Sequence, residues 1–241
     1  MSVSNASHYD GATSLAEAGL AALRHTGRRK LLTARSVHPH FRQVLRTYLE
    51  AADFSLEEFG FEKDGRFRRD EFGELFTEEI GGVVFQTPNF LGVVEGLEGI
   101  AEAVHSKGAL LILASNPISL GVLRPPGEWG ADLAVGEGQA LGLPTSFGGP
   151  YLGYFAATRE LVRRIPGRLA GMTIDREGKR AFVLTLQARE QHIRRERASS
   201  NICTNEGLCA LAAAIYLTLL GKEGIREVGE LNLDRAYYLR E

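Results

Sequence analysis

Glycine and proline are concentrated in one segment of the chain, between two short apolar runs. Five glycines and two prolines lie within residues 136–150. The apolar runs 133–135 and 151–157 on either side indicate a strand, a shaped loop and a returning strand. Because glycine adopts positive φ and has no side chain, such a loop lets its backbone approach a ligand or another chain closely. The segment is therefore a candidate binding loop.

A second polar segment, SNASHYDG, covers residues 4–11 and precedes residues 12–25, where small apolar residues recur at helical spacing. A polar loop at a helix N-terminus can bind phosphate through free backbone amides and the helix dipole. The alternative is that Ser7 or Asp10 caps the helix. Capping is the favoured interpretation.

Two other patterns suggest cofactor or metal chemistry. Residues 136–138, Gly-Glu-Gly, begin the nucleotide-binding pattern GxGxxG, but Leu141 stands at its last glycine position. The pattern also comes late in the chain, so a nucleotide-binding oxidoreductase is a weak alternative. His38 and His40 have no carboxylate or thiol neighbours in the sequence, and no metal site is predicted.

Cysteine and arginine residues gather towards the C-terminal part of the chain. Cys203 and Cys209 lie six residues apart, which places them on different faces of a helix, so we expect buried structural thiols without a disulfide or zinc. Residues 187–197 contain four arginines and two glutamates. A solvated face is the favoured interpretation of this stretch, and an anion or partner site is the alternative.

The chain has 241 residues, of which 44% are hydrophobic and 24% charged, so it can bury a sizeable core. Its net charge of −2 implies no bulk attraction to nucleic acid. The longest apolar run, 208–220, is too short to span a bilayer, and the N-terminus lacks the form of a signal peptide. We therefore expect no membrane association and a cytoplasmic protein.

The positions of the apolar runs predict an α/β fold with a mostly parallel sheet and helices on both faces. The expected strands lie near Leu31, Val83, Leu110, Leu133, Tyr151 and Phe182, all in one sheet, with the strand at Tyr151 antiparallel to its neighbour. The expected helices cover residues 12–25, 39–52, 69–80, 97–104, 158–164 and 205–220. Loops 87–89, 115–117 and 136–139 follow the strands and should form one rim, where such sheets bind ligands.

Four motifs resemble one known family. They are QTPNFLG (86–92), SLGVLRPPGEWGAD (119–132), GLPTSFGGP (142–150) and SSNICTNEGLCALAA (199–213). Together they resemble subunit 1, the α chain, of glycine dehydrogenase (decarboxylating), the P-protein of the glycine cleavage system. The resemblance implies that residues 1–220 form part of the large domain of a fold-type I pyridoxal-phosphate (PLP) protein. Residues 221–241 would begin a connecting helix towards a missing small domain, so the chain resembles a fragment.

The chain departs from the family's catalytic pattern at two places. In the family's β chain the PLP lysine lies five residues before the proline that matches Pro144, and this chain has Gln139 there. An amide cannot form a Schiff base. PLP chemistry also needs a carboxylate that keeps the pyridine nitrogen protonated, and strand 110–114 has no acid. The resemblance therefore implies no catalytic residue in this chain and PLP in the partner β subunit only.

The first functional hypothesis is a noncatalytic α subunit that pairs with a PLP-bearing β subunit. The pair would decarboxylate glycine and pass the aminomethyl group to the lipoyl group of H-protein. The alternative is a self-sufficient PLP-dependent, aminotransferase-like enzyme. The resemblance and the loop positions give these candidates for contact with a ligand at the rim: Asn5, Ser7, His8, Tyr9, Asn89, Gln139, Ser199, Ser200, Asn201 and Thr204.

Overall fold

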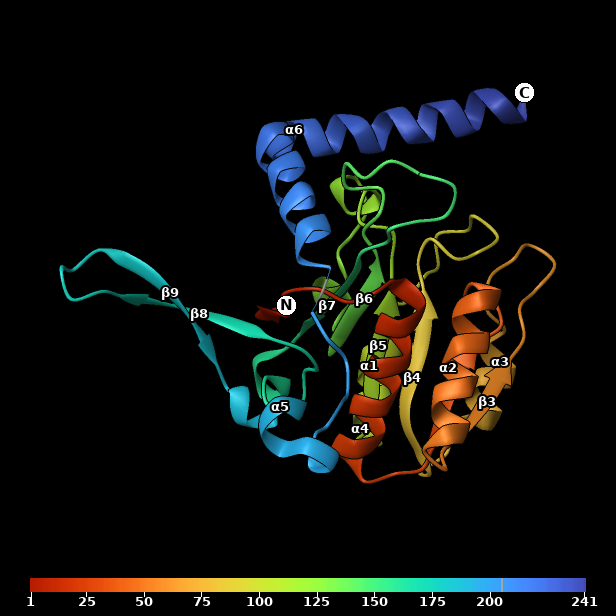
Figure 1. Cartoon of the computed structure of the whole chain (residues 1–241). Helices are drawn as coiled ribbons and strands as arrows, with labels where there is room; N and C mark the ends of the chain where they lie inside the picture. Colours follow the sequence, from red (N-terminus) through yellow and green to blue (C-terminus); the bar gives the residue numbers. More distant parts are fainter. Residues whose placement is uncertain (205) are drawn as a thin grey trace.

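A sheet of seven strands, in the order β1-β7-β6-β5-β4-β2-β3, carries the loops of interest in the computed structural model, which describes residues 1–204 and 206–241 (Figure 1). The strands are β1 (Val3–Ser4), β2 (Lys30–Ala34), β3 (Ser55–Phe59), β4 (Ile80–Gln86), β5 (Leu110–Ala114), β6 (Leu133–Glu137) and β7 (Gly153–Ala157). Strands β2 to β6 pair in parallel, and β7 is antiparallel to β6. The mostly parallel sheet and its antiparallel strand are confirmed.

The helices are α1 (Gly11–Thr26), α2 (Pro39–Ala51), α3 (Arg69–Leu75), α4 (Ile100–Ser106), α5 (Gln191–Arg194) and α6 (Gly207–Arg240). The step from β2 to β3 and the step from β4 to β5 move in opposite directions along the sheet. Because crossovers between parallel strands are right-handed, the two connecting helices, α2 and α4, cover opposite faces. Figure 1 shows α1 and α2 in front of the sheet and α4 behind it.

Several expected helices are shorter than the sequence pattern suggested. The helix expected over 69–80 ends at Leu75, because β4 already begins at Ile80. The helix expected over 158–164 is only a 3₁₀ turn, η3 (Arg159–Leu161). Further 3₁₀ turns connect other elements: η1 (Ser119–Gly121), η2 (Pro126–Trp129), η4 (Gln187–Arg189) and η5 (Arg195–Arg197).

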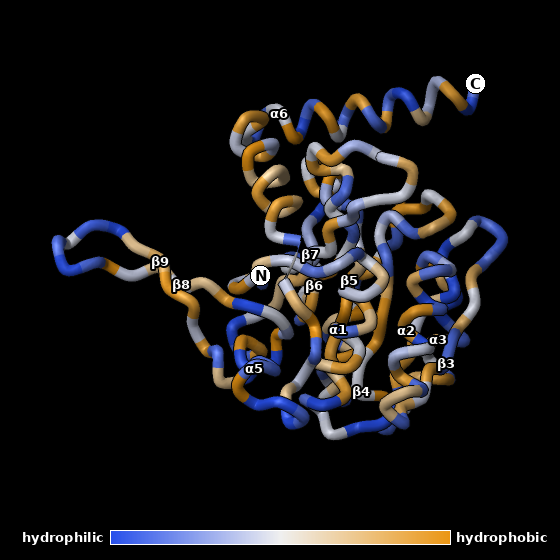
Figure 2. The backbone as a smooth tube through the Cα atoms, in the orientation of Figure 1, coloured by the Kyte–Doolittle hydropathy of each residue, from blue (hydrophilic) through white to orange (hydrophobic). Residues whose placement is uncertain are grey.

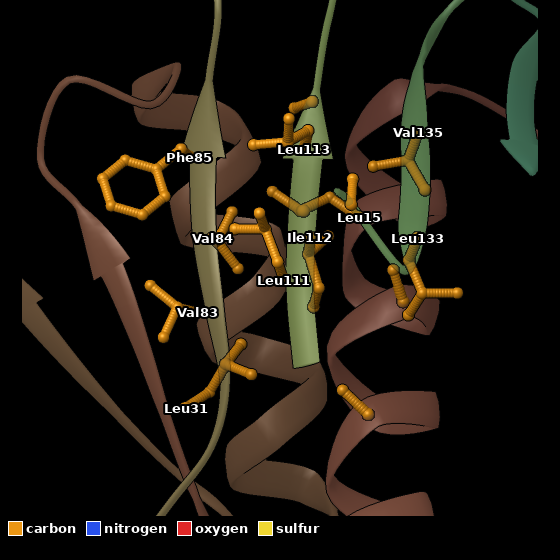
Figure 3. Packing of buried hydrophobic residues seen from close by; sticks show 14 of the residues in the cluster. Leu15, Leu31, Val83, Val84, Phe85, Leu111, Ile112, Leu113, Leu133 and Val135 are labelled. Carbon is orange, nitrogen blue, oxygen red and sulfur yellow. The ribbon is translucent and has the colours of Figure 1, made fainter. Parts of the chain in front are cut away.

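The core lies on both faces of the central strands, under α1 on one face and under α4 on the other. Leu111, Ile112 and Leu113 of β5 are all fully buried, although they point to alternate faces of the sheet (Figure 3). Continuous apolar strands of this kind need cover on both faces. The tube in Figure 2 is accordingly apolar along the central strands and of mixed hydropathy at the outer loops. This core fixes where the strands end, and with them the rim loops.

The strand near Phe182 does not join the main sheet, so that expectation was wrong. It is β9 (Arg180–Thr185), and it pairs only with β8 (Leu169–Ile174) in a hairpin that projects from the body (Figure 1). The turn between them closes with a hydrogen bond from Asp175 N to Lys179 O at 2.8 Å. The edge of β7 that faces away from β6, where another strand could add, is paired with β1.

Helix α6 bends at Gly221, which has φ 61° and ψ −168°. This is the boundary expected between an apolar helix and a connecting helix, and Asn205, the expected first residue, lies outside the described residues. The second arm packs on η1, where a Cβ at Gly121 would lie 2.6 Å from the carbonyl oxygen of Ile225. By length and hydropathy alone α6 could cross a membrane, and 11% of its most apolar window is buried.

Candidate functional site

The loops at the carboxyl ends of β4, β5 and β6 lie around one cavity of about 360 Å³, as the sequence predicted. Among its lining residues, Pro88 and Asn116 belong to the predicted rim loops 87–89 and 115–117, and Ala140 directly follows the predicted loop 136–139. Helix α6 closes the other side with Tyr216 and Leu233. Most lining side chains are apolar, and among the described lining residues none is a carboxylate, amine, guanidinium or imidazole.

The carboxylate of Glu137, at the end of β6, lies at the N-terminus of α1. Its Oε2 accepts a hydrogen bond from Gly11 N at 2.9 Å. Its Oε1 accepts hydrogen bonds from Gln139 N and Leu152 N, both at 2.9 Å. A helix N-terminus attracts anions through its free N–H groups and its dipole. In this chain the protein's own carboxylate takes that position.

Asp10 provides a second carboxylate at the same helix end. Its Oδ1 accepts from Thr13 N at 2.9 Å, and Thr13 Oγ1 accepts from Asp10 N at 3.3 Å, so the two residues form a capping box. Asp10, rather than Ser7, is thus the cap of α1. The first turn of the helix has two carboxylates bound to its amides.

Gln139 uses its side chain to shape the loop that contains it. Its Nε2 donates to Leu143 O at 2.7 Å, and its backbone N–H is bound by Glu137. The loop beyond it, from Gly142 to Pro150, is mostly exposed. The side chain at the expected lysine position therefore closes a turn within its own loop.

The end of β5 is joined to β7 through hydroxyl groups. The hydroxyls of Ser115 and Tyr154 lie 2.9 Å apart, and the Tyr154 hydroxyl donates to Ser115 O at 2.6 Å. Burial raises the pKa of the Tyr154 hydroxyl above its ordinary value. Gly136 packs over this pair, since a Cβ there would lie 2.2 Å from Ser115 O. The expected acid-free strand thus ends in a neutral hydroxyl pair.

Three of the expected ligand candidates, Asn5, Ser7 and His8, are buried beside β7. Asn5 Nδ2 donates to Ser7 O at 3.3 Å and to Pro166 O at 3.2 Å. The His8 ring stacks on Phe155 with centroids 5.4 Å apart, and burial lowers its pKa to about 3. None of these three residues lines the rim cavity. The structure places them in the packing that holds the start of α1.

Tyr9, Ser199, Ser200 and Asn201 come together along the side of α1. They line a second cavity of about 390 Å³, away from Gln139. Ser200 Oγ donates to Glu17 Oε1 at 2.8 Å, and burial raises the pKa of the Glu17 carboxyl, although the Ser200 hydrogen bond and Arg24 oppose that shift. This buried carboxyl had no signal in the sequence, because it lies in a helical run of small apolar residues.

Asn89 lies apart from both groups, whereas Thr204 lies near Asn5, because a Cβ at Gly167 would be 3.1 Å from Thr204 Cγ2 and 3.2 Å from Asn5 Nδ2. Asn89 is buried, and its side chain bonds to Gly65 O at 2.9 Å and to Glu95 Oε1 at 2.8 Å, so it fixes its own loop. Thr204 lines a cavity of about 340 Å³ with Arg168, Glu190 and His192 among others. The ten candidates therefore do not form a single site.

The histidines and cysteines singled out in the sequence have structural surroundings. His38 Nδ1 accepts from His40 N at 3.2 Å, so His38 caps α2. Within residues 1–204 and 206–241, no three His, Cys, Asp or Glu side chains gather as a metal site would require. Cys209 is buried as expected, but Cys203 is exposed, because it lies in the extended segment before α6 rather than on a helix.

The sheet order, the crossover helices and the rim of loops define the large α/β domain of fold-type I PLP-dependent proteins. Solved structures of a sphingosine-1-phosphate lyase from Burkholderia pseudomallei and of a NifS-like protein share this fold. The lyase matches with a TM-score of 0.60 and 15% identity, over 92% of this chain and 49% of its own. The NifS-like protein matches with a TM-score of 0.61 and 13% identity, over 94% of this chain and 54% of its own.

The chain belongs to the glycine cleavage system P-protein family, whose profile matches residues 1–241. It is 55% identical over 241 residues to a probable glycine dehydrogenase (decarboxylating) subunit 1 of Chlorobium phaeobacteroides, and 54% identical over 242 residues to that of Thermomicrobium roseum. It covers 54% of each relative, so it spans about half their length. An inhibitor-bound glycine decarboxylase (P-protein) crystal structure matches with TM-score 0.89 and 54% identity, over 94% of this chain and 51% of that one.

The residues at the rim do not fit a resident PLP. The cofactor needs an amine for its aldehyde, an acid near its ring nitrogen and amides for its phosphate. Gln139 offers no amine, and β5 offers no acid. Glu137 and Asp10 already occupy amides at the start of α1. In the sequence Glu137 stands out only as the middle residue of a Gly-Glu-Gly pattern, and no local pattern indicates its contact with Gly11.

Proposed function

We propose that this chain is the large-domain half of a noncatalytic subunit 1, and that it supports the decarboxylation of glycine by a partner β subunit that binds PLP. In this proposal the aminomethyl group passes to the lipoyl group of H-protein, and the complex works in the cytoplasm. The cofactor supplies the electron sink for decarboxylation when it is bound in the partner. This chain supplies a contact surface and structural support for the partner subunit.

The observation that carries the proposal is the contact between Glu137 and Gly11 at 2.9 Å. A resident anion at a helix N-terminus repels a second anion placed at the same amides. Since Gln139 Nε2 also donates to Leu143 O, both Glu137 and the residue at the expected lysine position are committed to internal bonds. The chain thus keeps the shape of a cofactor domain in which these two polar side chains are already paired.

The exposed loop from Gly142 to Pro150 is the part of the rim that fits contact with a partner. Phe147 in this loop is fully exposed, at 113% of the accessible area of a reference residue, and Tyr151, which follows the loop, is 44% exposed. A fully exposed phenylalanine has no role in the packing of its own chain, whereas aromatic side chains are enriched at protein interfaces. We therefore assign this loop to the contact with the β subunit.

The test is to mix the full-length subunit with its cognate β subunit and to measure glycine-dependent bicarbonate exchange with H-protein present. We expect exchange from the mixture and none from this subunit alone. The β subunit mixed with unfolded subunit 1 is the control for added protein. Exchange or transamination by this subunit alone would support the alternative, a self-sufficient PLP enzyme.

A further inference from the structure

An arginine-lined cleft lies near the C-terminal end of α1. Its volume is about 550 Å³, and its cationic lining consists of Arg24, Arg163, Arg164, Arg189, Arg194 and Arg197. Glu196 is the acidic residue among its described lining residues. These arginines come from α1, from the segment after η3 and from the segment of η4, α5 and η5. Because the chain carries a net charge of −2, this concentration of positive charge is local.

Two of the six arginines are fixed by backbone carbonyls and form a framework. Arg189 donates through Nε to Leu186 O at 3.1 Å and through Nη2 to Gly167 O at 2.8 Å. Arg24 donates through Nη1 to Ser199 O. These bonds tie the three segments together, so the cleft is held open by its own packing.

The other four arginines are exposed, and most have no partner. Among the described residues, Arg163, Arg164 and Arg194 form no ion pair, and Arg197 Nε lies 3.9 Å from Glu196 Oε1 in a pair with both side chains largely exposed. Such an exposed pair contributes little. Unpaired guanidinium groups around one cleft repel each other and attract carboxylates, which they bind through their planar forks.

The backbone around the cleft disfavours a small phosphate ligand. Sites for free phosphate generally use helix N-termini and clusters of backbone N–H groups. Here the nearest end of α1 is its C-terminus, where carbonyl oxygens carry the negative end of the dipole. The positive potential therefore comes from arginine side chains, most of them exposed. That arrangement suits electrostatic steering and contact with a protein surface.

We infer that the cleft of Arg163, Arg164 and Arg194 is a docking surface for an acidic segment of another protein, with several carboxylates close together. The partner is defined by that chemistry. This surface is separate from the rim cavity, since the two share no lining residue. The inference therefore goes beyond the proposed support of a PLP-bearing subunit, and it does not depend on Glu137 or Gln139.

The probe is a fluorescein-labelled oligoglutamate peptide, titrated with the full chain and followed by fluorescence anisotropy. We expect saturable binding that weakens as salt shortens the Debye length from about 30 Å at 0.01 M to about 8 Å at 0.15 M. The triple variant Arg163→Glu, Arg164→Glu, Arg194→Glu should bind at least about tenfold more weakly, because it reverses three charges at the cleft. An oligoglutamine peptide should not bind.

A matched triple variant, Lys63→Glu, Arg176→Glu, Arg235→Glu, changes the total charge equally at exposed positions outside the cleft. It should retain binding within about threefold, and circular dichroism of both variants checks that they fold. Equal weakening by the two triples would overturn the inference, as would no binding by the unmodified chain. Displacement of the peptide by inorganic phosphate at a comparable concentration would also overturn it in favour of a small-anion site.

Discussion

Glu137 and Gly11 are joined by a hydrogen bond of 2.9 Å between a carboxylate at the end of β6 and the first amide of α1. The bond places negative charge where the dipole of the helix is positive. It also ties the strand that precedes the glycine-rich loop to the helix that covers the sheet. A single acid therefore fixes the geometry of the rim and occupies the position that suits an external anion.

The first prediction concerns the change Glu137→Gln. Glu137 accepts three backbone N–H groups, from Gly11, Gln139 and Leu152. A glutamine has one acceptor oxygen, and its amide hydrogens would face N–H donors. We expect the free energy of unfolding, measured by urea titration, to fall by about 2 to 4 kcal/mol.

Glu74→Gln is the control for this change, because Glu74 is an exposed residue of α3. Its effect should stay within about 0.5 kcal/mol. Equal midpoints for the two variants would show that the carboxylate of Glu137 is not needed at the helix end.

The second prediction is that Gln139→Lys does not create a PLP site. The new amine would lie beside the Glu137 carboxylate, while β5 would still lack an acid and the start of α1 would still be capped by Asp10. After incubation with PLP and borohydride, mass spectrometry should show no stoichiometric adduct at the rim in the unmodified chain or in the variant. The partner subunit, treated in the same way, should show one.

A reduced PLP adduct at one equivalent on the unmodified chain, mapped to a rim residue, would refute the noncatalytic proposal. The same adduct in Gln139→Lys alone would show that the lysine was the one missing element. Either result separates the role of Gln139 from the role of its surroundings.

The third prediction concerns acid. The pKa of His8 is lowered from 6.5 to about 3 by burial, so the folded state binds fewer protons than the unfolded state between these pH values. The contribution of neutral His8 to the free energy of unfolding is therefore fully present above pH 6.5. It is lost as the pH falls towards 3, by up to about 1.4 kcal/mol per pH unit. His8→Phe, which keeps a ring against Phe155, should reduce that slope.

The measurement is the urea midpoint at several pH values below 6.5, compared between the variant and the unmodified chain so that other acids cancel. His25→Phe removes an exposed imidazole and serves as the control. An identical pH dependence for His8→Phe and the unmodified chain would mean that His8 takes up its proton without opening the fold.

The parts of the fold that follow from local patterns could be predicted, and the parts that depend on distant pairing could not. Uninterrupted apolar runs located β4, β5 and β6. The edge strand β3 had no such run, because its sequence SLEEF contains two glutamates. Glu58 forms ion pairs with two arginines of α2: its Oε1 lies 2.9 Å from Arg42 Nη1 and 3.1 Å from Arg46 Nη2. The edge position, rather than β propensity, makes this strand possible.

The candidate site shows the same division. The meeting of the three rim loops followed from the rule that parallel strands end on one side of a sheet. The bond between Glu137 and Gly11 joins residues 126 positions apart, and no local pattern announces it. The pairing of β9 with β8, and of β1 with the edge strand β7, is likewise seen only in the assembled fold. Contacts of this kind are set by the assembled fold.

The last prediction concerns the exposed loop and the partner subunit. Ser146, Phe147, Gly148 and Gly149 have φ values of 40°, 59°, 113° and 153°, so four successive residues hold an unusual conformation that presents Phe147 outward. Phe147→Ser removes an exposed side chain and should change the free energy of unfolding by less than about 0.5 kcal/mol. If Phe147 is an anchor at the interface, binding to the β subunit should weaken at least about tenfold.

Gly148→Val tests the same loop through its backbone. The nearest atom to a Cβ at Gly148 is the Tyr151 hydroxyl at 4.0 Å, so a side chain has space, but the φ of 113° is one that L residues rarely adopt. The valine should therefore rearrange the loop and impair assembly more than folding of the chain. Phe61→Ser, at an exposed phenylalanine outside the loop, is the control for Phe147→Ser. Unchanged co-elution and turnover with the β subunit for both loop variants would mean that the glycines serve an ordinary turn.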